Sequence, residues 1–395
     1  METNNQKNDQ NIIPNDADKQ QKGVNVPNLR FKEFNTAWIH SKIGEICEIE
    51  MCKRIFSNQT NTIGGVPFYK IGTIGGKPDT WISQNLFNEY KDKYNYPKKG
   101  EILITCSGTV GKCIIFNGED AYFQDSNIVW LANKSTVLNI FLFYIMNNID
   151  WSYLNSTTIT RIYGSDLRNL DFYYPNNKNE QQKVTEFLSL IDKRIDTQSK
   201  IIEKYESLIS TIRTNIFSSF QCKWTKLCDL VENKSLQLNR GNIIPKHPKD
   251  DVYKYPVYSS SVQKDGLMGY SDYYMFDKEL ITWSIDGGGD IFFREKHKFC
   301  VTNVCGILQL DTNKFSYRFV AEALKYQHSK MTFDYQTKAH PSVIEKLYAL
   351  PDIELNEQNK YSKLFEVLYS KLGNERKYLE IIKEQKKYLL SNMFI

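Results

Sequence analysis

Apolar residues recur in two long stretches of the chain with alternating steps of four and three residues. This spacing is the a and d seam of a heptad repeat, and it predicts two long helices, over residues 179–219 and 356–395. A lone helix with so narrow an apolar stripe is marginal in water, so we expect the two stripes to bury each other as an intramolecular coiled coil. The predicted interface residues are Val184, Leu188, Ile191, Ile195, Ile202, Tyr205, Ile209, Ile212, Ile216, Tyr361, Phe365, Leu368, Leu372, Leu379, Ile382, Leu389 and Met393.

Polar residues add two details to this pattern. Gln198 and Glu375 interrupt the two seams at equivalent places. Asn179, with Gln182 three residues later, is the predicted N-cap of the first helix. Outside its seam the first helix mixes basic and acidic residues, which predicts a solvated or protein-binding face rather than a DNA track.

A different residue pattern precedes each predicted helix. Short β-branched and aromatic runs separated by glycine, proline and asparagine predict one mixed, strand-rich domain over residues 27–178 and another over 220–355. Residues 1–26 are polar and lack periodicity, so we expect a flexible tail there. The predicted fold class is therefore α+β, with two tandem strand-rich domains each followed by a long helix.

Much of the second half of the chain repeats the first half at a constant shift in residue number, which indicates a tandem duplication. The segment EILITCSGTVGKCIIF (101–116) aligns with KELITWSIDGGGDIFF (278–293), and Asn-Glu-Gln at 179–181 aligns with 356–358 at the same shift. Upstream of residue 101 the register slips. The early parts of the two domains are therefore expected to differ.

Composition narrows the function classes. The chain has 395 residues, of which 41% are hydrophobic, enough for two or three cores. Its net charge of +5 is far below that of a purely electrostatic DNA binder, so DNA binding would need a shaped site or partners. Eight cysteines without zinc or redox spacing predict reduced thiols in a cytoplasmic protein. No apolar run suits a signal peptide or membrane span, so no membrane partner is expected.

The segment GTVGKC at 108–113 invites comparison with a phosphate-binding loop, but its spacing fails. Cys106 stands where the first glycine belongs, and Cys113 where a serine or threonine belongs. The strand-like residues that follow favour a hairpin turn with positive φ at Gly108 or Gly111. The five histidines lack metal-site spacing, and neither a nuclease-type acidic cluster nor the Asn-Pro-Pro-aromatic tetrapeptide of amino-group DNA methyltransferases occurs. We predict no catalytic residue and no metal or cofactor site in this chain.

Taken together, the duplicated motifs resemble the specificity subunit of a type I DNA restriction and modification system, over about Pro27 to Ile395. The motifs are the Trp38 and Trp224 domain openings, the EILITCSGTVGK and ELITWSIDGGG hairpins, and the segments NNKNEQQKVTEFLSLIDKRI and LNEQNKYSKLFEVL at the two helix starts.

The resemblance implies two target recognition domains that each read one half of an interrupted DNA site. It implies an antiparallel helix pair with pseudo-two-fold symmetry that measures the unread gap. It also implies two copies of a modification subunit, which carry S-adenosylmethionine and methylate adenine, and separate restriction subunits that use ATP and Mg²⁺. None of those catalytic parts belongs to this sequence. Because the two domains differ in sequence, the double-stranded DNA site should be asymmetric.

Base reading is expected in Gly- and Ser-rich loops, where polar and basic side chains can reach base edges. For any one residue, a solvated side chain or a turn hydrogen bond is an open alternative. Arg161 and Arg240 lead, because the guanidinium fork pairs bidentately with guanine. The candidates in the first domain are Lys53, Arg54, Lys70, Ser107, Thr109, Lys112, Thr160, Arg161, Tyr163 and Ser165, and those in the second are Arg240, Tyr258, Ser259, Ser260, Lys264, Ser284, Asp286, Lys338 and His340.

Two other functions are compatible with parts of the sequence. A structural coiled-coil scaffold, whose globular ends bind other proteins, would account for the helices alone. A nucleotide-dependent enzyme would rest on GTVGKC alone, and it would require ATP or GTP binding that Lys112→Ala abolishes.

Overall fold

The computed structural model describes residues 25–134, 136–151, 161–260, 263–286, 290–331 and 339–395. The chain divides into two compact units, one made of residues 1–196 with 380–395 and the other of residues 197–379. The predicted flexible tail lies almost entirely outside the described residues.

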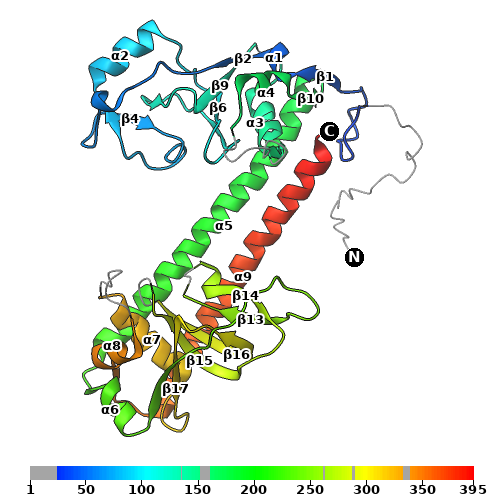
Figure 1. The fold of residues 1–395 in the computed structure, drawn as a ribbon. Helices are drawn as coiled ribbons and strands as arrows, with labels where there is room; N and C mark the ends of the chain where they lie inside the picture. The colour runs from blue at the N-terminus through cyan, green and yellow to red at the C-terminus, as the bar shows by residue number, and fades with distance from the viewer. Residues whose placement is uncertain (1–24, 135, 152–160, 261–262, 287–289, 332–338) are drawn as a thin grey trace, which may run out of the picture. The chain divides into compact units, whose positions relative to one another are not determined.

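Many of the short elements of the two units carry labels in Figure 1. Those of the first unit are β1 (Ile39–Lys42), α1 (Ile43–Ile46), β2 (Cys47–Glu50), β3 (Thr60–Asn61), β4 (Val66–Tyr69), β5 (Trp81–Ile82), α2 (Gln84–Lys93), β6 (Ile102–Thr105), β7 (Cys113–Ile115), β8 (Tyr122–Phe123), β9 (Ile128–Asn133), α3 (Asn139–Asn148), α4 (Gly164–Asn169) and β10 (Asp171–Tyr174). Those of the second are β11 (Trp224–Lys226), α6 (Leu227–Glu232), β12 (Leu236–Arg240), β13 (Tyr255–Tyr258), β14 (Leu267–Ser271), β15 (Phe276–Ser284), β16 (Ile291–Val301), β17 (Cys305–Leu310), α7 (Tyr317–His328), α8 (Pro341–Leu347) and β18 (Ala349–Pro351).

The main sheet of the first unit is buried on both faces. In β6, Ile102 and Ile104 join a core that contains Phe141 of α3, whereas Leu103 joins a second core that contains Phe87 of α2 and Phe68 of β4. Successive strand residues point to opposite faces of a sheet, so a strand covered on both sides reads as a continuous apolar run.

The two units share one strand order. The first has the order β2-β9-β6-β7, and the second has β12-β17-β15-β16 followed by β13 and β14. The strands β6, β7 and β9 correspond to β15, β16 and β17 at the shift seen in the sequence, which confirms that the predicted duplication is a duplication of fold. In the first unit the early strands form a separate sheet, in the order β3-β5-β4-β8, whereas in the second β13 and β14 join the main sheet. This difference agrees with the unequal early parts of the repeats.

A two-stranded ribbon closes each unit just before its long helix. β1 pairs with β10 in the first unit, and β11 pairs with β18 in the second. Trp38, which directly precedes β1, is buried and donates through Nε1 to Glu180 Oε1 at 3.0 Å. Arg30 Nε lies 2.7 Å from the same carboxylate oxygen, so the chain entry of the first unit is tied to the first turn of its helix.

The two long helices are α5 (Lys178–Ser219) and α9 (Leu355–Met393). The expected N-cap was wrong by two residues, because the Asn177 side chain accepts from Asn179 N at 2.9 Å and α5 begins between them. The start of α5 shares a core with Met393 near the end of α9, and the end of α5 shares a core with Phe365 near the start of α9. The helices therefore contact each other in antiparallel directions, as the resemblance implied.

Candidate nucleic-acid interface

The β6–β7 hairpin places the central candidates of the first domain at one end of its sheet. Ile104 pairs with Cys113, so residues 106–112 form the turn between the strands. Gly108 and Gly111 both adopt positive φ, +68° and +77°, which confirms the predicted turn geometry. The residues after the turn are strand β7, whereas a phosphate-binding loop would need the N-terminus of a helix there.

Two further segments meet this turn. Cys106 N donates to Asn127 O at 2.8 Å, and Ser107 Oγ donates to Asn127 Oδ1 at 2.8 Å. Arg161 forms an isolated antiparallel bridge with Ser107, and its Nη2 donates to Ser126 O at 3.3 Å. Residues 106–112, 125–127 and 161–163 thus meet at one end of the sheet, and we call this group the first turn cluster.

Other basic candidates lie around the first turn cluster. Arg54 is exposed, and its Nε is 3.9 Å from Asp125 Oδ2. Lys112 Nζ donates to Ile74 O at 2.5 Å, which uses its ammonium to hold a neighbouring loop. The remaining described candidates of this domain are half-buried Lys70, whose Nζ lies 2.9 Å from Asp79 Oδ1, and exposed Lys53, Thr109, Tyr163 and Ser165.

The second unit builds a comparable group of turns from different residues. Arg240 Nε and Nη2 donate to Asn303 O at 3.0 and 2.7 Å. Ile285 N donates to Val304 O at 3.0 Å, and so ties the β15–β16 turn to the same segment. Asn303 and Val304 align with Ser126 and Asn127 at the constant shift of the duplication, so the two turns are repeat equivalents. We call residues 240–242, 284–286 and 302–304 the second turn cluster.

Several second-domain candidates serve the interior of the fold. Ser284 is fully buried, and its Oγ donates to Ser260 O at 2.9 Å and Asp286 O at 2.5 Å. Ser259 is also buried, and its Oγ accepts from Thr302 Oγ1 at 3.0 Å. These serine hydroxyls are used within the domain and do not lie on its surface.

Half-buried Tyr258 packs on the buried guanidinium of Arg294. The Arg294 guanidinium lies 3.8 Å from the centre of the Tyr258 ring, and the Tyr258 hydroxyl is 3.1 Å from His297 Nε2. Burial lowers the pKa of Arg294 to about 10. Arg294 Nε donates to Thr282 Oγ1 at 3.0 Å, while its Nη2 has no hydrogen-bond partner among the described residues.

The last candidates lie beside or within segments that the structure does not describe. His340 is exposed and caps α8, because its Nδ1 accepts from Ser342 N at 3.4 Å. Thr160 and Lys338 lie outside the described residues, as does the side chain of Lys264. For every candidate on this surface, DNA contact stays a prediction.

None of the predicted seam residues of α5 and α9 is exposed. The two interrupting residues contact each other: Gln198 is buried, and its Nε2 donates to Glu375 O at 3.1 Å and to Glu375 Oε2 at 2.5 Å. Gln198 and Glu375 are related by the constant shift, so each is the repeat equivalent of the other. A polar pair at a seam position is the kind of contact that fixes the register of a coiled coil.

The repeated Asn-Glu-Gln motif has a function in the fold that sequence reasoning missed. Gln181 Oε1 accepts from Leu138 N at 2.7 Å and its Nε2 donates to Pro175 O, which joins the first turn of α5 to the start of α3. Gln358, its repeat equivalent, accepts from Ser316 N at 3.0 Å at the start of α7. Both glutamines are buried, so each fixes a domain on its own long helix. The repetition of the motif at the constant shift was the signal that could have found them.

Charged groups also join each domain to both long helices. In the first unit, Asp192 of α5 accepts from the Tyr144 hydroxyl of α3 at 2.8 Å and lies 2.5 Å from Lys386 Nζ of α9. In the second unit, Arg213 of α5 donates to Glu322 Oε2 of α7 at 2.7 Å and to the hydroxyl of α9 Tyr369 at 3.0 Å.

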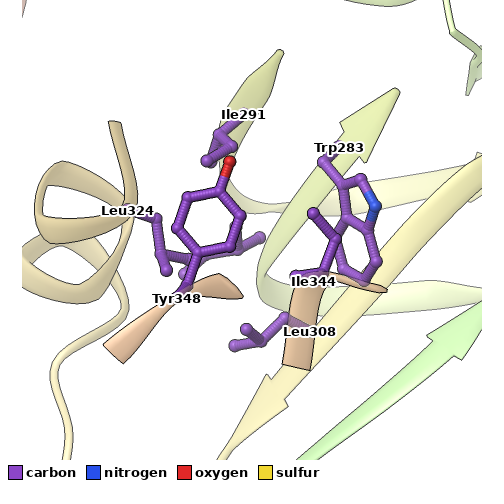
Figure 2. A pocket seen from close by; sticks show the side chains of 7 residues that line it. Trp283, Ile291, Leu308, Leu324, Ile344 and Tyr348 are labelled. Carbon is purple, nitrogen blue, oxygen red and sulfur yellow. The ribbon is translucent and has the colours of Figure 1, made fainter. Parts of the chain in front are cut away.

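Two hollows lie in the second unit: a small cavity in its core, and a more open pocket of about 350 Å³ whose lining includes Ser235, Lys314 and Gln358. Figure 2 shows apolar side chains around a cavity of about 10 Å³ in the core of the second unit, among them Trp283, Leu324 and Tyr348. That volume is at the limit for one water molecule, so the cavity is a packing void. No group of three or more His, Cys, Asp or Glu side chains is placed to hold a metal ion in the part of the chain that the structure describes. The helices of that part are all too short or too polar to cross a membrane.

A family model described as the type I restriction modification DNA specificity domain matches residues 35–207 and again residues 223–384. A putative type I restriction enzyme specificity subunit of Haemophilus influenzae is 44% identical over 172 residues, which are 43% of this chain and 41% of that protein. A putative type I specificity subunit of Mycoplasma pneumoniae is 28% identical over 173 residues, which are 42% of this chain and 45% of that protein. The matched part thus spans less than half the length of these curated relatives.

Solved structures share the fold. The crystal structure of a type I restriction-modification system S subunit from M. genitalium superposes with a TM-score of 0.58 and 19% identity, covering 94% of this chain and 99% of that one. A chain from a structural study of complex assembly and conformational transition in the type I R-M system has a TM-score of 0.52 and 12% identity, covering 90% of this chain and 97% of that one.

Proposed function

The chain belongs to the family of type I restriction-modification DNA specificity proteins, and from that premise we propose that it is the DNA-recognition subunit of such a complex. Residues 27–178 and 220–355 are its target recognition domains, and each reads one half of an interrupted, asymmetric site in double-stranded DNA. The observation that carries the proposal is the double match of the family model, once in each half of the chain. The two turn clusters, built from unlike residues, support two different half-sites.

In this proposal the chain is not catalytic by itself. Two copies of a modification subunit bind it and methylate adenine with S-adenosylmethionine, and restriction subunits supply ATP- and Mg²⁺-dependent cleavage in the cytoplasm. A net charge of +5 agrees with this division, because partners can supply much of the attraction to phosphates while this chain supplies contacts to base edges.

The test mixes the purified full chain with its modification subunit and a library of split DNA sites. We expect a stable complex that methylates adenine only where both half-sites and one gap length are present. Either subunit alone should lack that selectivity. Failure to form a complex, or methylation without sequence preference, would contradict the proposal and favour a coiled-coil scaffold.

A further inference from the structure

In each unit an arginine guanidinium donates to a backbone carbonyl, and the two carbonyls are repeat equivalents. Arg161 Nη2 donates to Ser126 O at 3.3 Å, and Arg240 Nε and Nη2 donate to Asn303 O at 3.0 and 2.7 Å. Ser126 and Asn303 are repeat equivalents, because they are related by the same shift as the two hairpins. Each carbonyl lies in the short segment that leads into the strand beside the hairpin, β9 in the first unit and β17 in the second.

Duplication alone does not explain this recurrence, because the two arginines are not repeat equivalents. The residue that matches Arg161 in the second repeat is Lys338. Strand register matches Glu50 of β2 with Asn239 of β12, because their partners Trp130 and Ile307 are repeat equivalents, so Arg240 corresponds to Met51. One arginine precedes helix α4 and the other ends strand β12. Two unlike parts of the chain therefore place an arginine guanidinium on equivalent backbone carbonyls of the two units.

The chemistry of a held guanidinium is suited to reading a base. A carbonyl that accepts one or two of its N–H groups fixes the plane of the fork, which lowers the entropy cost of a further planar contact. Arg240 is exposed, and its two hydrogen bonds to Asn303 O use Nε and Nη2, so these bonds do not occupy the Nη1 donors. The arginine fork matches the O6 and N7 acceptors of guanine in the major groove.

We propose that Arg161 and Arg240 are the specificity-determining arginines of the two target recognition domains, each pairing with a guanine of its own half-site. The inference rests on the proposed function, and it adds the residue and the base. Each arginine acts on one half-site and leaves the other half unchanged.

The experiment measures methylation of a library of split sites by the full complex. Arg240→Gln should reduce discrimination at one base position of one half-site by about 5- to 150-fold. Arg161→Gln should do so in the other half-site. Arg240→Lys and Arg161→Lys keep the charge and lose the fork, so they should lose the same discrimination with the salt dependence of binding retained. Lys93→Gln and Lys249→Gln are controls on exposed lysines that belong to neither cluster, and they should keep every base preference.

The outcomes separate the inference from its premise. Unchanged discrimination at every base in all four arginine variants would overturn the inference. Uniform weakening over all sequences would also overturn it, because that is the effect of a phosphate contact. If a glutamine variant fails to fold, the lysine variant at the same position decides. A parent complex without sequence preference would instead refute the proposed function.

Discussion

At the scale of single residues, Glu322 places a carboxylate in the interior of the second unit, where it has no solvent exposure. Burial acts to raise its pKa, but the charges of Lys325 and Arg213 outweigh burial and hold the pKa below its usual value. The ion pair is therefore formed at neutral pH, between a domain helix and a long helix. Because both partners are withdrawn from water, removing one leaves the other without compensation.

We expect Arg213→Ala to destabilise the second unit by about 3 kcal/mol or more, because it leaves Glu322 buried and charged. Arg376→Ala is the matched control, since the Arg376–Glu206 pair is half exposed and should contribute less than about 1 kcal/mol. Urea unfolding, monitored by hydrogen exchange in α7, measures the change in the free energy of unfolding in both variants. Equal effects of the two substitutions would show that the buried pair has no special role.

A second residue-scale prediction concerns His328 of α7. Burial lowers its pKa, although Asp290 acts in the opposite direction, and its Nδ1 lies 2.8 Å from the Tyr348 hydroxyl. The folded state therefore favours the neutral ring. The unfolded state binds more protons just below the ordinary histidine pKa of about 6.5, so stability should fall as the pH drops through that value. Below the lowered pKa of the folded state the loss should level off.

Thermal unfolding between pH 7.5 and 5 measures this effect in the second unit. The variant His328→Asn removes the titrating ring, and the difference between the two curves cancels the other titrating groups. If the stability of the parent protein changes with pH as steeply as that of His328→Asn over this window, the assignment to His328 is refuted.

At the scale of elements, how much the sequence predicts depends on whether the signal is local. The heptad spacing extends over many turns, so it predicts both long helices with boundaries within two residues of those observed. The hairpin at Gly108 and Gly111 follows from a short motif whose turn needs positive φ. In contrast, Arg161 and Arg240 reach equivalent carbonyls from unrelated places, and no spacing in the chain encodes that meeting. Ser284 looked like a loop residue because three glycines follow it at 287–289, yet strand pairing buries it.

The matched glutamines give a prediction for these elements. Gln181→Ala should leave Leu138 N and Pro175 O without partners in the first unit, and Gln358→Ala should do the same to Ser316 N in the second. An unsatisfied buried backbone group costs about 1–3 kcal/mol, so each variant should lose roughly 2–4 kcal/mol in its own unit.

Hydrogen exchange in α3 and α7 reads the two units separately. The neighbours Gln182 and Asn359 are exposed, and their substitution by alanine is the control, with less than about 0.5 kcal/mol expected. A loss shared equally by both units after a single glutamine substitution would contradict a domain-specific role.

At the scale of the whole molecule, each long helix belongs to both units. The division falls at residues 196–197 of α5 and at 379–380 of α9. Gln198 contacts Glu375, and repeat-equivalent residues of two antiparallel helices can face each other at only one level. This contact fixes the pairing, so that each step toward the C-terminus of α5 from Gln198 faces a step toward the N-terminus of α9 from Glu375. Matched segments of the two helices can then be removed without changing the register elsewhere.

Removing residues 199–202 together with the facing residues 371–374 shortens both helices by about 6 Å, since each residue adds about 1.5 Å. This length is close to the rise of two base pairs, at about 3.4 Å each along one strand. If the helices set the gap between half-sites, the shortened complex should methylate sites whose gap is shorter by one or two base pairs, with both half-sites unchanged. Removing 199–202 alone moves one seam against the other and should reduce stability and assembly. Methylation of a gap library decides: an unchanged gap would show that the helices do not measure it, and altered half-sites would show that reading and spacing are not separate tasks of this chain.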